Sequence, residues 1–141
     1  MTSYYKGLEF KTQLEAKWAA FFDLAGWYWW VNPIAIGNWK PDFKVTFKCG
    51  HSECGGDHTL LIAVLPVSSL ESFDGHPCLT HNYKVVNDNG EWQADGGAAF
   101  GNSPSVTQWQ ISHGAGGGIE DIYFRVQDAD KLWVQVESLV K

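Results

Sequence analysis

Thr59-Leu-Leu-Ile-Ala-Val-Leu-Pro66 is a short, unbroken run of apolar residues that a proline closes. Its length is typical of a strand, and apolar residues at consecutive positions indicate that both faces of that strand are buried. A strand buried on both faces lies inside a sheet, where other elements cover it above and below. We therefore predict that this run is the central strand of the fold.

The stretch before this strand predicts one helix and two further strands. Thr12-Gln-Leu-Glu15 is a capping-box pattern, apolar residues then recur at helical spacing, and Gly26 supplies a stop, which together predict a helix over residues 12–25. Aromatic and β-branched residues predict a strand over 27–31. Alternation of apolar and polar side chains predicts another strand over 43–48, with one buried face. Residues 1–10 are expected to be a lead-in that packs on the body of the protein.

The stretch after the central strand predicts a hairpin, more strands and a closing helix. Asn87-Asp-Asn-Gly90 is a strong turn signal between two short strands. Asp128 or Asp130 is expected to cap the closing helix. The apolar face of that helix is expected to consist of Leu132, Trp133, Val136 and Leu139. The further strands are predicted at residues 98–100, 106–111 and 119–126.

The composition indicates a well-packed globular protein. The chain has 141 residues, 45% of them hydrophobic, with 8 Trp and 8 Phe, which is enough to bury a sizeable core. We expect a single domain over residues 1–141, with an α/β fold in which a mixed central β-sheet is flanked by helices.

The charge balance argues against a nucleic-acid partner. The formal net charge is −6, and Arg125 is the sole arginine, whereas nucleic-acid binders neutralise phosphates with clustered Lys and Arg. An acidic surface suits a basic protein partner. The chain shows neither a basic and apolar leader nor an apolar run near the roughly 18 residues of a membrane span. A cytoplasmic protein without a membrane partner is the expectation.

Two acidic residues stand out by their positions. Glu15 lies in the first turn of the predicted helix, where it completes the capping box or is an exposed acid that the helix dipole favours. Asp42 follows Pro41 at the beginning of a predicted strand, where an ordinary turn aspartate is common. Each residue therefore has a structural explanation of its own.

The order of these features resembles the PD-(D/E)XK (restriction-endonuclease-like) nuclease superfamily, particularly its small phage-borne members. The resemblance rests on Glu15 in a helix, Pro41-Asp42 before a strand and a buried strand next, and it covers about residues 12–66. It implies a restriction-endonuclease-like core in which Asp42 is the first metal-binding carboxylate and the buried strand carries Glu-x-Lys. This chain has Ala63 and Leu65 at those two positions, so the resemblance implies a degenerate active site.

The loss of this pair leads to the favoured expectation for function. Mg²⁺ depends on converging carboxylate oxygens, and Ala63 removes the ligand expected opposite Asp42, while Leu65 removes the lysine. We expect a catalytically inactive nuclease-like binding protein, and the resemblance suggests a phage-encoded inhibitor of a host nucleic-acid-handling defence complex. One alternative is a Mg²⁺-dependent nuclease that keeps Glu15 and Asp42 and uses Glu71 as a relocated acid.

A second alternative is a structural or assembly protein stabilised by zinc. Cys49, His51, Cys54 and His58 give the spacing C-x-H-x2-C-x3-H, and thiolate and imidazole are the ligands that zinc prefers. Four protein ligands would close the coordination sphere, so such an ion would be structural. The competing interpretation is a polar hairpin loop whose cysteines are there by chance.

The last candidate is the glycine-rich stretch from His113 to Gly118. A glycine loop suggests phosphate binding, but this one lacks the Lys and Ser/Thr of a P-loop and does not match the dinucleotide fingerprint. A flexible turn is the favoured interpretation.

Overall fold

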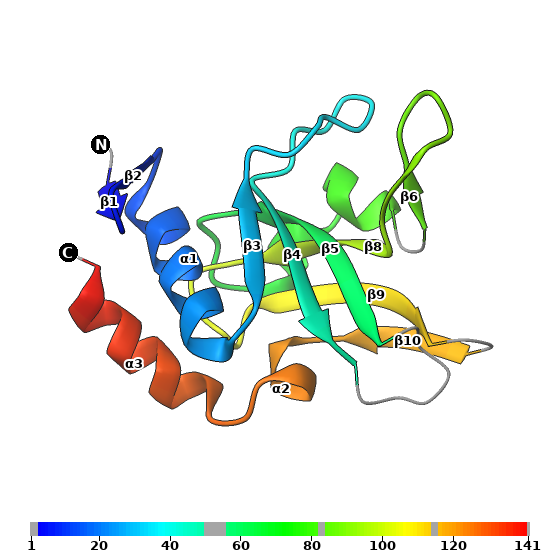
Figure 1. The fold of residues 1–141 in the computed structure, drawn as a ribbon. Helices are drawn as coiled ribbons and strands as arrows, with labels where there is room; N and C mark the ends of the chain where they lie inside the picture. The colour runs from blue at the N-terminus through cyan, green and yellow to red at the C-terminus, as the bar shows by residue number, and fades with distance from the viewer. Residues whose placement is uncertain (1–2, 50–55, 82–83, 114–115, 141) are drawn as a thin grey trace.

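The computed structural model describes residues 3–49, 56–81, 84–113 and 116–140. Its centre is a six-stranded mixed sheet with the strand order β10-β9-β8-β5-β4-β3 (Figure 1). The strands are β3 (Tyr28–Val31), β4 (Phe43–Lys48), β5 (Asp57–Val64), β8 (Gly96–Phe100), β9 (Thr107–His113) and β10 (Gly116–Glu120). The prediction of a mixed central sheet flanked by helices is confirmed.

The predicted central strand lies inside the sheet as β5. It pairs antiparallel with β4 and parallel with β8, and every residue from His58 to Val64 is buried. The other neighbouring strands pair antiparallel. Parallel pairing requires a long crossover connection, which here spans residues 65–95 and contains the elements that cover one face of the sheet.

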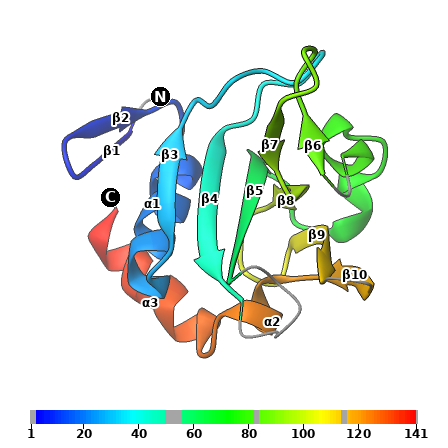
Figure 2. The ribbon, with the colours of Figure 1, turned by 45° about the vertical axis from the view of Figure 1, so that its right-hand side comes forward.

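Two helices, α1 (Gln13–Ala25) and α3 (Ala129–Leu139), pack against one face of the sheet (Figure 2). Trp18 of α1 is fully buried at the centre of this layer, with its ring centroid 4.7 Å from that of Phe100 and 4.5 Å from that of Trp133. Its indole nitrogen donates to the backbone carbonyl of Gly101 at 2.8 Å. No helix in the described ranges is long and apolar enough to cross a membrane.

The opposite face of the sheet is covered by the crossover connection. This connection contains two 3-10 helices, η1 (Leu70–Phe73) and η2 (Pro77–Thr80), and the predicted hairpin, formed by β6 (Val85–Val86) and β7 (Trp92–Ala94). A second apolar cluster, called here the crossover cluster, fills this side. Its buried members are Ile36, Trp39, Leu61, Ala63, Phe73, Cys78, Val85, Ala94, Ala99 and Val106.

The ends of the helices follow the predictions in part. Thr12 caps α1 by accepting a hydrogen bond from the Glu15 backbone nitrogen at 3.1 Å, and Gly26 ends the helix in the left-handed conformation, as predicted. Asp128 is at the N-cap of α3, but its side chain makes no capping hydrogen bond. Leu139 is 54% exposed, so its predicted core position is wrong. Val140, which follows the helix in an extended conformation, is buried in its place.

The lead-in packs on the body through Tyr5 and Phe10, as predicted, but two segments differ from the predictions in detail. Residues 1–10 contain a hairpin, β1 (Ser3–Tyr5) and β2 (Leu8–Phe10), whose turn residues Lys6 and Gly7 both have positive φ. The edge segment predicted over 119–126 begins earlier, as β10, and ends at Glu120. The short helix α2 (Ile122–Arg125) follows it, with Asp121 as its N-cap.

Candidate functional site

Three charged side chains meet where the beginning of α1 approaches the beginning of β4. Lys11 Nζ lies 3.3 Å from Asp42 Oδ1 and 3.7 Å from Glu15 Oε1. Glu15 comes from the first turn of α1, and Asp42 immediately precedes β4. The two acidic residues singled out in the sequence are therefore brought together, and Lys11 lies against both of them.

Glu15 has its capping role and its place in the site at the same time. Its backbone nitrogen donates to Thr12 Oγ1, and its carboxylate in turn interacts with the backbone of Thr12, which completes the capping box. The side chain is nevertheless buried beside Asp42. The interpretation of Glu15 as an exposed acid in the first turn is wrong.

Asp42 lies where β4 and β5 separate, and two hydrogen bonds to β5 hold it in position. The regular pairing ends at Phe43 opposite Ile62, and the Asp42 backbone nitrogen donates to the Ile62 carbonyl at 2.8 Å. The Val64 backbone nitrogen donates to Asp42 Oδ2, also at 2.8 Å. Asp42 Oδ2 therefore links the beginning of β4 to the end of β5, while Oδ1 contacts Lys11.

The pKa values of Glu15 and Lys11 are both changed by their surroundings. The pKa of Glu15 is raised, because burial disfavours its charge and the neighbouring Asp42 adds negative charge and a hydrogen bond. Burial lowers the pKa of Lys11, but the charges of Asp42 and Glu15 outweigh this effect and raise it. The ammonium group of Lys11 offsets part of the negative charge of the two carboxyl groups.

A small cavity opens beside this group. Its volume is about 130 Å³, and it is lined by Glu9, Phe10, Lys11, Glu15, Val31, Asn32, Asp42 and Phe43. Ligand pockets for small molecules usually have volumes of about 300–1,000 Å³. This cavity therefore has room for water or a small ion, but not for a nucleotide.

The two positions at which the resemblance led us to expect Glu-x-Lys, Ala63 and Leu65, lie in or against the apolar crossover cluster. Ala63 is 2% exposed and belongs to the same cluster as Trp39 and Phe73, while Leu65 packs against that cluster. This region is apolar, and burial there raises the pKa of the Cys78 thiol to about 12. The negative charge of Asp42 adds to this increase, which shows that Asp42 is near. The side of Asp42 that faces the crossover connection thus consists of packed core.

Glu71, the candidate for a relocated acid, is not brought to the site by any observed contact. It lies on η1 and is exposed. Its carboxylate makes no hydrogen bond or ion pair with the residues that the structure describes. Nothing in its position favours a role beside Asp42.

The predicted zinc loop is described only at its two ends. Cys49 and His58 are both buried, whereas His51 and Cys54 lie outside the described residues. Within the described ranges, no group of three or more His, Cys, Asp and Glu side chains is close enough to hold a metal ion. The predicted glycine loop from His113 to Gly118 is likewise incomplete, since residues 114–115 are outside the description, while β9 and β10 pair on either side of them.

Two residues of these sites were missed in the sequence. Lys11 directly precedes the capping box, and its i,i+4 spacing to Glu15 was the available signal. Asp95 binds His58 from 37 residues away, and no local pattern announces such a contact.

Comparison with known proteins does not assign the chain to a family. No protein-family model matches the chain, and no curated protein and no solved structure gives a match.

Proposed function

We propose that this protein is a catalytically inactive, nuclease-like binding protein whose restriction-endonuclease-like core has lost half of its active site. The observation that carries the proposal is Ala63, a 2% exposed residue of the crossover cluster on the strand that Asp42 contacts. In the resembled superfamily this position supplies a metal-binding acid. Here a small apolar side chain is packed there, so a second carboxylate opposite Asp42 is missing.

The contacts of the retained acids support the same conclusion. Glu15 and Asp42 still lie side by side, as the resembled superfamily would require. Lys11 contacts both carboxylates, whereas Mg²⁺ depends on several converging oxygens to fix its position. A lysine in contact with both acids offsets part of their negative charge without supplying a metal ligand.

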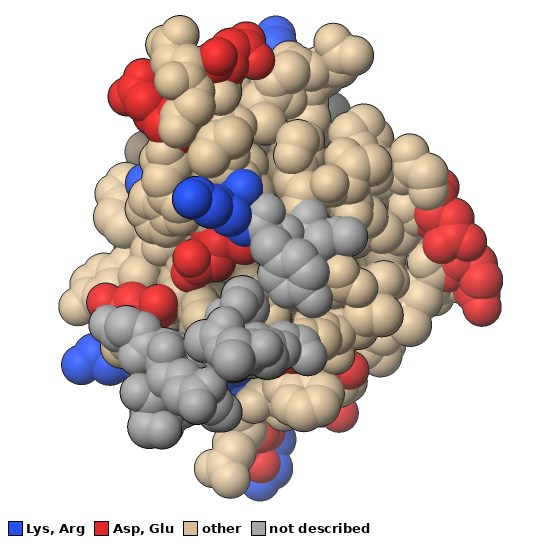
Figure 3. Space-filling model, turned by 90° about the vertical axis from the view of Figure 1, so that its right-hand side faces the viewer, with Lys and Arg blue, Asp and Glu red and all other residues tan. Residues whose placement is uncertain are grey.

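The charge distribution supports a protein as the partner. The chain has a net charge of −6. On the face that Figure 3 shows, the charged side chains of the described residues form separate small groups among mostly uncharged ones, without an extended band of Lys and Arg. Nucleic-acid binders use such a band of Lys and Arg to neutralise the phosphates of the backbone. A basic host or phage protein is therefore the proposed partner, and inhibition of a host nucleic-acid-handling defence complex in the cytoplasm is the proposed setting, which derives from the resemblance.

A cleavage assay tests the loss of catalysis. Single- and double-stranded DNA and RNA are incubated with Mg²⁺ or Mn²⁺ and the wild type, Asp42→Ala, Glu71→Gln or the double variant Ala63→Glu/Leu65→Lys. The wild type should leave every substrate intact. Cleavage by the wild type that Asp42→Ala abolishes would refute the proposal, and its loss in Glu71→Gln would identify the relocated acid.

Capture from a host lysate tests the binding function separately. Immobilised wild type should retain a basic protein that elutes as the salt concentration rises, because screening weakens contacts between exposed charges. Retention of nucleic acid in place of protein, confirmed by its sensitivity to added nuclease, would contradict the proposed partner class.

A further inference from the structure

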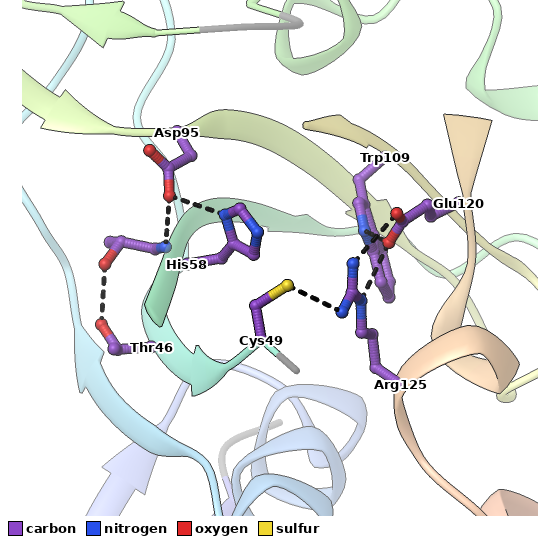
Figure 4. A network of polar contacts seen from close by, with 8 residues as sticks. Thr46, Cys49, His58, Asp95, Trp109, Glu120 and Arg125 are labelled. Atoms are coloured by element: carbon purple, nitrogen blue, oxygen red, sulfur yellow. Dashed lines mark hydrogen bonds and ion pairs between the residues drawn. The ribbon is translucent and has the colours of Figure 1, made fainter. Parts of the chain in front are cut away.

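The short helix α2 lies at a corner of the molecule, between the end of β10 and the start of α3 (Figure 1). Ile122 at its start and Val126 just after its end are buried, and the Ile122 backbone nitrogen donates to Thr107 Oγ1 at 3.0 Å. Arg125 is paired with Glu120 of β10 by two contacts of 3.0 Å each (Figure 4). The side chains that α2 presents to solvent therefore project from a fixed backbone.

Three apolar side chains of α2 and α3 are exposed to solvent. Phe124 is 72% exposed, the highest value among the large hydrophobic side chains that the structure describes, and Val134 is 68% exposed. Tyr123, also exposed, reaches from α2 to α3 and donates its hydroxyl hydrogen to Asp130 Oδ1 at 3.1 Å. Asp130 and Val134 are four residues apart on α3, so their side chains are neighbours on one face. These four residues are called here the corner surface.

The charged groups around the corner surface are mostly acidic. Asp121 is the N-cap of α2, Asp128 is the N-cap of α3, and Glu137 lies two turns beyond Asp130 on the same helix face. In the part of the chain that the structure describes, none of these carboxylates forms an ion pair. Lys131 is the only base on α3. The corner surface therefore combines exposed apolar groups with an excess of negative charge.

We propose that the corner surface is the docking site for a basic peptide segment of a partner protein. Apolar side chains of that segment pack on Phe124 and Val134, which removes these side chains from water. A lysine or arginine next to them lies against Tyr123 and Asp130, where an aromatic ring and a carboxylate both attract a cation. A backbone that is fixed before binding reduces the entropy cost of docking. The inference rests on the proposed function, in that the basic partner proposed there carries the segment.

The charge of the corner surface decides between the possible occupants. Its carboxylates repel the phosphates of nucleic acids and the anionic headgroups of membranes. A second copy of this chain, with a net charge of −6, is disfavoured for the same reason. A basic protein segment complements both the exposed apolar groups and the carboxylates.

Fluorescence anisotropy with a synthetic probe tests the proposal on the full chain. The probe is a labelled amphipathic helical peptide of lysine and leucine, and the control peptide has glutamate in place of lysine. The wild type should bind the lysine peptide more tightly than the glutamate peptide, and less tightly as the salt concentration rises. Phe124→Ser should weaken binding about 10-fold or more, as the loss of an aromatic anchor does. Trp92→Ser, at an exposed aromatic residue of β7, should leave binding unchanged.

A second pair of variants separates this site from a general attraction between opposite charges. Asp130→Asn removes one charge and keeps an acceptor for the Tyr123 hydroxyl, and it should weaken binding about 2–5-fold. Asp88→Asn removes the same charge from an exposed turn and should have a smaller effect. Amide chemical shifts of the wild type locate the bound peptide without any variant, and the largest changes should be at Tyr123, Phe124 and Val134.

The outcomes that overturn the docking site differ from those that refute the proposed function. A wild type that binds neither peptide, or both equally, overturns the docking site, as do equal effects within either pair of variants or largest shift changes elsewhere in the chain. Retention of a basic host protein that Phe124→Ser leaves unchanged also overturns it, while the proposed function stands. Nucleic-acid cleavage by the wild type refutes that function, whereas a lysine peptide bound at the corner surface still supports the docking site.

Discussion

The carboxylate of Asp42 accepts the backbone N–H of Val64, with 2.8 Å between Oδ2 and the nitrogen, where β4 and β5 separate. This contact gives the first acid of the resembled nuclease motif a structural task that does not depend on a metal. The same carboxylate reaches Lys11 through Oδ1. Asp42 therefore contributes to the local fold whether or not the site performs chemistry.

Replacing Asp42 should show how much this strand contact stabilises the fold. Asp42→Ala leaves the Val64 N–H without its acceptor, which costs about 1–3 kcal/mol of unfolding free energy. Asp42→Asn keeps an acceptor oxygen and loses mainly the exposed contact with Lys11, which is worth about 0–1 kcal/mol. Urea unfolding measures both, with Asp74→Ala as the exposed control. Equal losses in Asp42→Ala and Asp42→Asn would assign the effect to charge.

The raised pKa of Glu15 predicts a pH-dependent penalty. A carboxyl group whose pKa is higher in the folded than in the unfolded state binds more protons when folded, so stability falls as pH rises above its ordinary value of 4.5. Glu15→Gln keeps the capping geometry and removes this penalty. The unfolding free energy of Glu15→Gln relative to wild type should therefore increase with pH until the folded-state pKa is passed. Unfolding curves in a pH series measure it, and a difference between Glu15→Gln and wild type that stays constant with pH would contradict the prediction.

The packing around Ala63 predicts that restoring the missing acid is costly. Ala63→Glu places a carboxylate in the apolar crossover cluster, beside Trp39 and Phe73, and burying a charge there costs several kcal/mol. Ala35→Glu makes the same change at an exposed alanine and should alter stability by about 0.5 kcal/mol or less. Thermal unfolding compares the two. Equal stability would mean that the space beside Asp42 is open to solvent.

Gly97 should tolerate no side chain. A Cβ at this position would collide with the backbone carbonyl oxygen of Cys78, so β8 and η2 would have to separate. Gly97→Ala should lose about 1–3 kcal/mol or more, as overpacked cores do. Gly118→Ala, on edge strand β10 with open space around the new methyl group, should be neutral or slightly stabilising. The melting temperatures of the two variants test this difference. An equal change of melting temperature in both variants would contradict the prediction.

The sequence predicted elements whose signals are local. The capping box from Thr12 to Glu15 and the apolar run of β5 specify their own structure, and both were located to within two or three residues. The first hairpin was missed because its strands have three residues each, although Gly7 was a turn signal. Leu139 was misplaced because helical periodicity cannot show where the chain leaves the helix.

The candidate site was predictable where one motif supplies the residue and not where tertiary contacts do. Glu15 and Asp42 were found by their order along the chain. The contribution of Lys11 depends on how α1 approaches β4, and that of Asp95 depends on β7 ending beside β5. Such contacts are set by the packing of distant elements, and a single sequence contains no spacing rule for them.

The parallel pairing of β5 with β8 has a consequence for the order of folding. Strands β3, β4 and β5 are successive antiparallel neighbours, so they can associate through short loop closures. β8 cannot pair with β5 until the two ends of the connection over residues 65–95 have come together. Loop closures of this length slow folding. We expect the first three strands with α1 to associate first, and the half of the sheet from β8 to β10 to join them in a later and slower step.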